Sequence, residues 1–201
     1  MGEQNDIREL PATWKKLNLG CNQNVLSGWV NVDLEPFEGV EIAADLEKPW
    51  PWEDGSIHYI RAVDIVEHLH DPIHTMNEAW RVLGQGGIFE ILVPSTDGRG
   101  AFQDPTHVSF WNQNSFIYYS RQNFAGLYPS LIKCDFEFRC FDTQPNDANV
   151  IWTWALCKAL KDPDAEPMVP ETWFDALSAQ EPERRVMPGY AGSNLGTMTF
   201  G

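Results

Sequence analysis

Short apolar segments separated by turn residues alternate along most of the chain. The segments are rich in Val, Ile, Leu and aromatic residues, which is typical of β-strands. The pattern predicts seven strands, at residues 16–20, 29–33, 40–45, 57–63, 88–93, 135–141 and 150–156. Each of the first five strands ends in or directly before Gly, Asp or Pro, at the position where an open α/β sheet places its ligand-binding crevice.

Helical spacing is strongest between the fourth and the fifth of these strands. Asp71 is a suitable N-cap, Pro72 suits the first turn, and apolar residues then recur at helical spacing until Gly84, which is expected to end the helix. A strand, a helix and a strand in this order form a right-handed parallel crossover. A further helix is expected from a cap at Asn112 towards Tyr119.

The last two strands and the connection between the first two differ from this strand–helix–strand unit. A hairpin turn predicted at residues 144–147 joins the last two strands, so the last strand is expected to be antiparallel. The interval from Gly20 to Trp29 is shorter than the ~10–12 residues that a helical crossover needs. We therefore expect an α/β fold with a seven-stranded, mostly parallel sheet, helices on both faces, and a first helix shortened to a loop or a single turn.

Proline becomes frequent after Lys161, at positions 163, 167, 170, 182 and 188. This spacing leaves room for one short helix around residues 173–177. We expect one domain over residues 1–160, followed by a Pro-rich acidic extension over residues 161–201 that packs on the domain or on a partner.

Composition narrows the classes of function. The chain has 201 residues, with 29 acidic against 14 basic side chains, and this acidity disfavours a protein that binds duplex nucleic acid through its phosphates. No apolar run approaches the ~18 residues of a membrane span, and residues 1–8 do not resemble a secretory signal. The four cysteines are scattered without a C-x-x-C pair, so we expect reduced thiols in a cytoplasmic protein, although their number alone also permits disulfides.

Gly20 and Asp33 end the first two predicted strands. A glycine there lets the backbone approach a ligand, and a carboxylate on the neighbouring strand can accept both hydroxyl protons of a ribose. A tight turn and a solvated Asp explain the same residues equally well. Asp45, after the third strand, can accept a hydrogen bond from the amine of adenine or can simply cap a turn. A nicotinamide dinucleotide is disfavoured, because the sequence lacks the G-x-G-x-x-G pattern and a long first helix.

Two further stretches carry a more specific signal: residues 63–69, which contain Glu-His-Leu, and residues 77–87, which contain Arg-Val-Leu and Gly-Gly. Together with the earlier motifs, in this order, they resemble the class I S-adenosylmethionine-dependent methyltransferases, in particular the small, type-11-like branch. The resemblance is close over residues 16–94 and looser to residue 160. It implies a Rossmann-like fold and S-adenosyl-L-methionine as the cofactor.

The resemblance also implies a set of cofactor contacts. They are Gly20, Cys21 and Asn22 at the methionine part, Asp33 with Leu34 at the ribose, Asp45 and Leu46 at the adenine, Asp64 at the amino group, and Glu67 and His68 at the sulfonium end or in a supporting position. Asn22 stands where the family has a second glycine, and Asn tolerates left-handed backbone better than most residues.

Methyltransferases of this type place their acceptor-binding loops after the fifth strand, here at residues 94–107. His107 near Asp104 can act as a general base, and Arg99 can pair with an acidic group on the acceptor. Trp111 and its aromatic neighbours are expected in the core or in a lid over the acceptor. The segment can equally be a loop held by its own polar side chains, and methyl transfer by positioning alone needs no base.

His70 and His74 have a spacing that occurs in zinc sites. Because Asp71 and Pro72 begin the helix, His70 lies outside it, and the two rings need not share a face. We expect no metal site.

The sequence therefore predicts a cytoplasmic S-adenosylmethionine-dependent methyltransferase that modifies an oxygen or nitrogen of a small-molecule or saccharide acceptor. Residues 97–134 hold two acidic and three basic residues, so the expected acceptor side is not acidic. The overall negative charge is therefore only a weak argument against a nucleic acid acceptor. The alternative is a cofactor-binding subunit or regulator without transfer activity, which the missing glycine and the shortened helix would favour.

Overall fold

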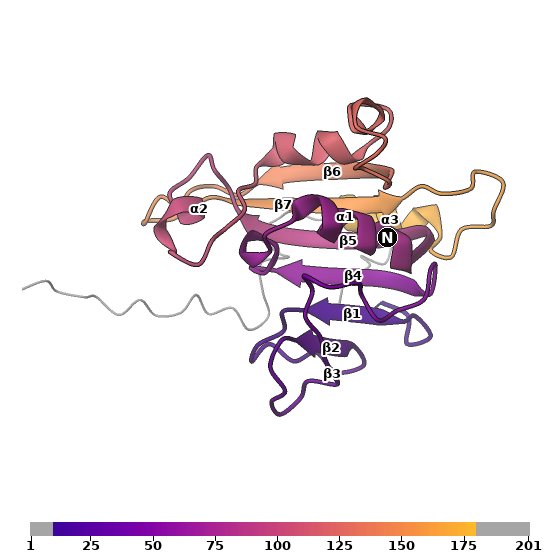
Figure 1. The fold of residues 1–201 in the computed structure, drawn as a ribbon, viewed down its shortest axis with the longest axis horizontal. Coiled ribbons are helices and arrows are strands. Elements are labelled where there is room, and N and C mark those ends of the chain that lie inside the picture. The colour runs from indigo at the N-terminus through magenta and orange to yellow at the C-terminus, as the bar shows by residue number, and fades with distance from the viewer. Residues whose placement is uncertain (1–9, 180–201) are drawn as a thin grey trace, which may run out of the picture.

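Residues 10–179, which the computed structural model describes, form a single seven-stranded sheet (Figure 1). The strand order is β3-β2-β1-β4-β5-β7-β6. The strands are β1 (Lys16–Leu19), β2 (Val30–Asp33), β3 (Ile42–Ala43), β4 (Ile57–Val63), β5 (Leu83–Pro94), β6 (Phe136–Asp142) and β7 (Trp152–Ala159). The five strands from β3 to β5 pair in parallel, whereas β7 is antiparallel to both of its neighbours. This architecture confirms the predicted α/β fold with its antiparallel last strand.

Two strands differ from the sequence prediction by more than one residue in length. β3 has only two residues, because it pairs only with β2 at the edge of the sheet. β5 begins at Leu83, directly after the helix, so the helix ends one residue before the end predicted from Gly84. A Cβ atom at Gly84 would lie 2.5 Å from the sulfur of Met168. Glycine is required here because the C-terminal segment crosses close to the strand.

Helical segments occupy the connections on the carboxyl side of β4 and β5 and the end of the described chain. They are η2 (Val66–His68), α1 (Pro72–Val82), α2 (Gly100–Gln103), η3 (Gln113–Tyr119), η4 (Ala125–Leu127) and α3 (Glu171–Ser178), where η denotes a 3₁₀ helix. Asp71 caps α1 as predicted, since its carboxylate accepts a hydrogen bond from the His74 amide at 2.9 Å. Asn112 caps η3 as predicted, although the turns that follow are 3₁₀. Only turns connect β1 to β2, which confirms the shortened first helix.

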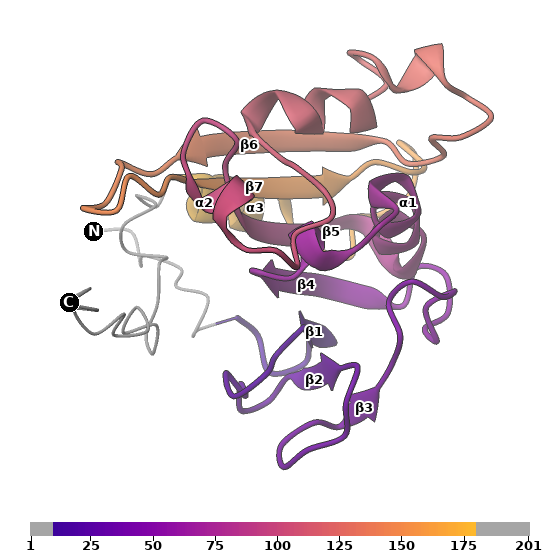
Figure 2. The same cartoon turned by 60° about the vertical axis from the view of Figure 1, so that its left-hand side comes forward.

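The helices cover both faces of the sheet (Figure 2). On one face, Met76 and Ala79 of α1 pack into a core with residues of β1, β4 and β5. On the other face, Phe174 and Leu177 of α3 pack with Trp14 and the far side of β5 and β7. Helices on both faces were predicted, and α3 agrees with the helix expected at residues 173–177. Residues 180–201 of the expected extension lie outside the described residues, and its separation from the domain stays a prediction.

The four cysteines are free thiols, as the sequence analysis expected. Burial raises the pKa of Cys134 to about 12, so this thiol is held in its unreactive protonated form. Within residues 10–179, no helix combines the length and apolar character needed to cross a membrane.

Arg81, the arginine of the Arg-Val-Leu motif, ties α1 to the segment before β4. Its guanidinium donates to Glu78 at 2.7 and 2.8 Å, to Asp54 at 2.7 Å, and to the carbonyl oxygens of Trp50 and Trp52 at 3.0 and 2.9 Å. Glu78 in turn accepts from the Trp50 amide at 2.6 Å. The Arg81 side chain is only 29% exposed, so these bonds are largely shielded from water.

Replacing Arg81 with Met should lower the free energy of unfolding by about 2 kcal/mol, because a partly buried carboxylate and two carbonyl groups lose their donor. Urea denaturation followed by circular dichroism measures the change. Arg99→Met, at an exposed arginine, is the matched control and should leave stability within about 0.5 kcal/mol. Equal stability of the two variants would show that Arg81 contributes nothing beyond a solvated charge.

Candidate functional site

A cavity of about 240 Å³ lies at the carboxyl ends of the first four strands. Its lining residues are Gly20, Asp33, Leu34, Ala44, Asp45, Leu46, Glu47, Ile65, His68, Leu69 and His70. Six of the ten cofactor contacts implied by the resemblance are in this set, while Cys21, Asn22, Asp64 and Glu67 are not. In Figure 1, the ends of β1 and β4 and the segment with α2 lie on the same side of the sheet, as expected for a crevice at strand ends.

The turn after β1 has the left-handed backbone that the sequence suggested. Gly20 has φ +60° and Asn22 has φ +41°, so Asn does adopt the conformation usually left to glycine. A Cβ atom at Gly20 would lie 2.6 Å from the side chain of Ile65, which fills the space above it. The Cys21 side chain is buried, and its amide donates to the Val32 carbonyl at 3.1 Å.

Gly20→Ala should destabilise the protein by about 2 kcal/mol, since it adds a contact with Ile65 to the strain of a left-handed alanine. Gly28→Ala is the matched control, because Gly28 has φ +78° but no atom within 4 Å of its missing Cβ. The difference between the two variants in thermal unfolding isolates the contact. The double change Gly20→Ala, Ile65→Ala should recover part of that difference, and a failure to recover any would contradict the packing explanation.

Asp33 and Asp45 each hold a backbone amide while facing the cavity. The Asp33 carboxylate accepts from the amides of Asn22 and Leu34, both at 2.8 Å, and so fixes the turn after β1 against the end of β2. Asp45 accepts from the Glu47 amide at 3.0 Å. Each carboxylate has about four acceptor positions, so both retain positions for a ligand. Asp33 and Asp45 can therefore stabilise their turns and still accept hydrogen bonds from a ligand.

Asp64, at the end of β4, has φ +49° and accepts a hydrogen bond from the indole of Trp152 at 3.2 Å. Its amide donates to the Leu92 carbonyl at 2.9 Å. These contacts fix the backbone that leads from β4 into η2, where the Glu-His-Leu motif lies.

Glu67 is the most unusual side chain of this motif. It is only 2% exposed, and neither carboxylate oxygen has a hydrogen-bond partner among the described residues. Burial, followed by the nearby charges of Asp64 and Asp104, raises the pKa of Glu67 to about 8. Its backbone carbonyl accepts from the amides of Val108 and Ser109 at 2.9 and 3.0 Å, so η2 and the segment after α2 are held together.

His107 points towards this carboxylate and not towards Asp104. Its Nε2 lies 4.0 Å from Glu67 Oε1, and its Nδ1 lies 3.0 Å from the Ala101 carbonyl oxygen. Asp104 accepts instead from the Thr106 amide and hydroxyl, at 2.8 and 2.6 Å. His107 lies near Asp104 through its backbone, because its amide donates to the Asp104 carbonyl oxygen at 3.3 Å, while its ring faces Glu67. His68 completes the group, with its ring 5.0 Å from that of His107.

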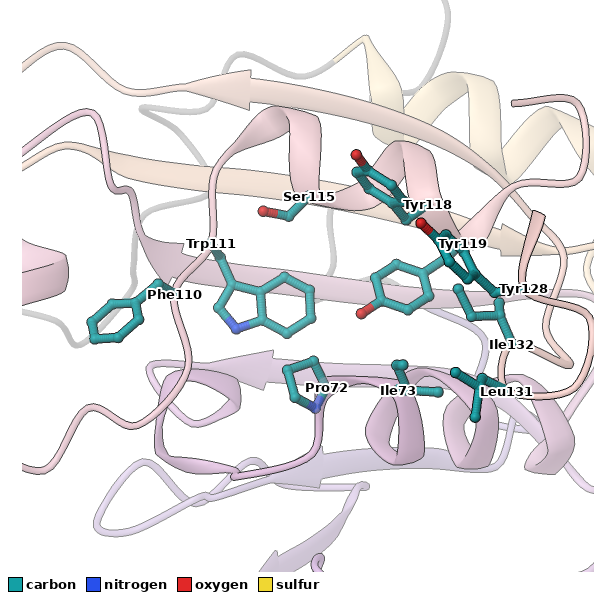
Figure 3. Close-up of a pocket in the computed structure, with 10 residues that line it drawn as sticks. All are labelled: Pro72, Ile73, Phe110, Trp111, Ser115, Tyr118, Tyr119, Tyr128, Leu131 and Ile132. Carbon is teal, nitrogen blue, oxygen red and sulfur yellow. The ribbon is translucent and has the colours of Figure 1, made fainter. Parts of the chain in front are cut away.

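A second, larger cavity of about 450 Å³ lies between α1 and η3 (Figure 3). Trp111 and Tyr119 extend into it above Pro72 and Ile73 at the start of α1 (Figure 3). Trp111 is buried, and its indole donates to the Ser109 hydroxyl at 3.0 Å. Arg99 does not line this cavity and lies on the surface.

His70 and His74 are engaged in separate contacts. His70 contacts the Glu47 carboxylate through Nδ1 at 3.0 Å, whereas His74 Nε2 lies 3.0 Å from the Lys48 carbonyl oxygen. The two rings do not form a common site, which agrees with the sequence argument about the start of the helix.

The segments that line the cavity at the strand ends match a family of known proteins. The family model described as "Methyltransferase domain" matches residues 21–91, which span the turn after β1, Asp33, Asp45 and the Glu-His-Leu motif. Over these residues the chain is similar to a methyltransferase domain. The type-11-like branch expected from the Glu-His-Leu motif agrees with this match, and the methyl donor of such methyltransferases is S-adenosyl-L-methionine. A comparison with curated proteins found no significant match.

Solved structures share the fold of this chain at low sequence identity. A methyltransferase from Bacillus halodurans is 17% identical, with a TM-score of 0.51 over 76% of this chain and 94% of its own. The YcgJ protein of Bacillus subtilis is 12% identical, with a TM-score of 0.53 over 77% and 95%. The 1,6-didemethyltoxoflavin-N1-methyltransferase of Burkholderia thailandensis, solved with 1,6-didemethyltoxoflavin and S-adenosylhomocysteine, is 10% identical, with a TM-score of 0.54 over 74% and 72%.

Sequence reasoning did not find two features of the candidate site. Ile65 fills the space above Gly20, and Glu67 meets His107 across 40 positions of sequence. Neither contact has a local sequence signal, because each joins residues from different connections of the sheet. The only hint was that both partners of the second contact are titratable residues in motifs that follow neighbouring strands.

Proposed function

We propose that the protein transfers a methyl group from S-adenosyl-L-methionine to an oxygen or nitrogen of a small-molecule or saccharide acceptor. The observation that carries the proposal is the cavity at the ends of β1 to β4, because it gathers six predicted cofactor contacts from four separate segments. A methyltransferase domain match over the same segments supports it.

The cofactor would lie across the strand ends, with each part facing a group of matching chemistry. Asp33 would accept the ribose hydroxyl protons with the positions that its two amide contacts leave. Asp45 would accept from the adenine amine, with Leu46 beside the ring. The methionine part would follow the Gly20 turn towards Asp64, which leaves the sulfonium near η2 and His68.

The acceptor is proposed to enter from the segment after β5. The cavity between α1 and η3 has the size of a small-molecule site, since such pockets are usually about 300–1,000 Å³. Trp111 and Tyr118 offer flat faces on which a planar ring or a sugar can pack, and Ser115 offers a hydroxyl. Arg99, on the surface nearby in sequence, remains a proposed contact for an acidic group of the acceptor.

In the transfer, the methyl group moves from the sulfonium of the cofactor to the acceptor atom. The acceptor atom loses a proton, and the cofactor becomes S-adenosylhomocysteine. The Ala101 carbonyl holds the proton of neutral His107 at Nδ1, so the Nε2 atom, which faces Glu67 at 4.0 Å, carries the lone pair. His107 remains the proposed proton acceptor, and Asp104 would act on it only through its charge.

Calorimetric titration with S-adenosylmethionine and S-adenosylhomocysteine tests the first half of the proposal. We expect both to bind in the micromolar range, and binding of neither below about 1 mM would overturn the proposal. A radiolabelled methyl-transfer screen over hydroxylated, amine and saccharide acceptors tests the second half. If both ligands bind and no acceptor class is methylated, the protein is the non-catalytic cofactor-binding subunit that Asn22 and the missing first helix would favour.

A further inference from the structure

A carboxylate and two histidine rings converge where η2 meets the segment after α2. One ligand atom from each of Glu67, His68 and His107 lies within 4.8 Å of the other two. The Glu67 and His107 side chains are only 2% and 7% exposed, so the group lies mostly out of solvent. The fold has thus brought His107 next to the adjacent residues Glu67 and His68 of another connection.

Both histidines are oriented by backbone carbonyl groups. His107 Nδ1 lies 3.0 Å from the Ala101 oxygen, and His68 Nδ1 lies 3.2 Å from the Thr106 oxygen. A carbonyl oxygen can only accept, so it fixes the ring proton on Nδ1 and leaves the lone pair on Nε2. Carbonyl groups orient metal-binding histidines in the same way in known metal sites.

The burial of the Glu67 carboxylate is not explained by its contacts in the described part of the chain. Its two oxygens have no hydrogen-bond partner in the described part of the chain. Asp64 and Asp104 add negative charge to its surroundings. A buried carboxylate without a donor is costly, and binding a cation removes that cost.

We propose that Glu67, His68 and His107 bind a divalent transition-metal ion such as Zn²⁺, Fe²⁺ or Co²⁺. Two imidazole nitrogens and one carboxylate oxygen favour these ions over Mg²⁺ and Ca²⁺, which prefer oxygen ligands. Three protein ligands leave at least one coordination position open, next to the proposed cofactor cavity that His68 also lines. This site replaces the earlier expectation of no metal.

The spacing of the ligands requires a small adjustment. Ligand atoms that lie about 2.0–2.1 Å from a tetrahedral ion are roughly 3.3 Å from one another. The 4.0 Å between Glu67 Oε1 and His107 Nε2 exceeds this by less than 1 Å. The three ligand atoms lie within 4.8 Å of one another, so binding of the ion requires side-chain shifts of up to about 1.5 Å.

Titration of the tag-free, chelator-treated protein with Zn²⁺ by calorimetry tests the proposal, and Co²⁺ with its visible absorption bands reports the coordination. We expect one ion per chain with a dissociation constant below about 10 μM. Glu67→Gln and His107→Gln should each weaken binding at least tenfold. His74→Gln is the matched control, because His74 is a histidine outside the group, and it should bind as the unchanged protein does.

Zn²⁺ should also raise the melting temperature of the unchanged protein and of His74→Gln but not of Glu67→Gln. Because Gln has nearly the shape of Glu and carries no ionisable group, we expect Glu67→Gln to fold, and it keeps the test valid if His107→Gln does not. Absence of binding below 1 mM, or equal binding to Glu67→Gln, would overturn the site. Either result leaves the proposed transferase activity standing, because no cofactor or acceptor is used. Binding as expected would exclude His107 as the proton acceptor, because an ion would occupy its Nε2.

Discussion

Glu67→Gln is expected to make the metal-free protein more stable than the unchanged chain at pH 8. The pKa of Glu67 is raised from 4.5 to about 8 in the folded state, chiefly by burial. Between these values the unfolded chain has lost the proton and the folded chain has kept it, so stability falls as pH rises. Each pKa unit corresponds to about 1.4 kcal/mol, so the loss across the window is roughly 3–5 kcal/mol. Gln carries no charge and does not titrate.

Urea denaturation at pH 5, 6.5 and 8 with chelator present measures this effect. The groups near the carboxylate are Asp64, Asp104, His68 and His107, and they are the same in both proteins, so the difference between the two proteins isolates Glu67. We expect a gain of about 3 kcal/mol for the variant at pH 8 and little difference at pH 5. Glu53→Gln removes an exposed carboxylate and is the control. A stability difference that does not grow with pH would contradict the assignment of a strained, buried carboxylate.

Asp33→Ala is expected to lower the affinity for S-adenosylmethionine by about 10- to 100-fold, corresponding to the roughly 1.5–3 kcal/mol of a hydrogen bond to a charged group. The loss has two sources. The ribose would lose its acceptor, and the turn after β1 would lose the 2.8 Å contact between the Asn22 amide and Asp33. Calorimetric titration measures the change.

Two further variants separate these sources. Asp33→Asn retains an acceptor for the Asn22 amide but removes the charge, so its affinity should lie between those of the unchanged protein and Asp33→Ala. Glu35→Ala removes an exposed carboxylate two positions away and should leave the affinity unchanged. Unaltered binding by Asp33→Ala would show that the cofactor does not use the cavity at the ends of β1 to β4.

The strands and α1 were predictable because their signals are local. Alternating apolar runs, the Asp71-Pro72 start and the short interval after Gly20 each act over a few residues, and all three reappear in the structure. The order of the motifs likewise placed six of the proposed contacts at one cavity, since the carboxyl ends of parallel strands meet at one edge.

Features that the sequence did not reveal depend on contacts between distant segments. Gly84 was predicted only as a helix stop, and the structure shows that its missing side chain also makes room for Met168 of the C-terminal segment. His107 was predicted near Asp104, and nothing in the sequence indicated that its ring faces Glu67, 4.0 Å away on another connection. A sequence pattern indicates which groups are near one another along the chain, but it does not indicate which distant segments pack against them.

The sequence by itself determined the fold class, the family resemblance and most of the proposed cofactor contacts. These follow from hydrophobic periodicity and from motifs at strand ends, which act through local geometry. Only the tertiary structure decided that Glu67, His68 and His107 form one group, because its members lie on two connections that meet through the Glu67 carbonyl and the amides of Val108 and Ser109. The burial that deprives Glu67 of partners arises from the same packing, and it is a property of the folded chain alone.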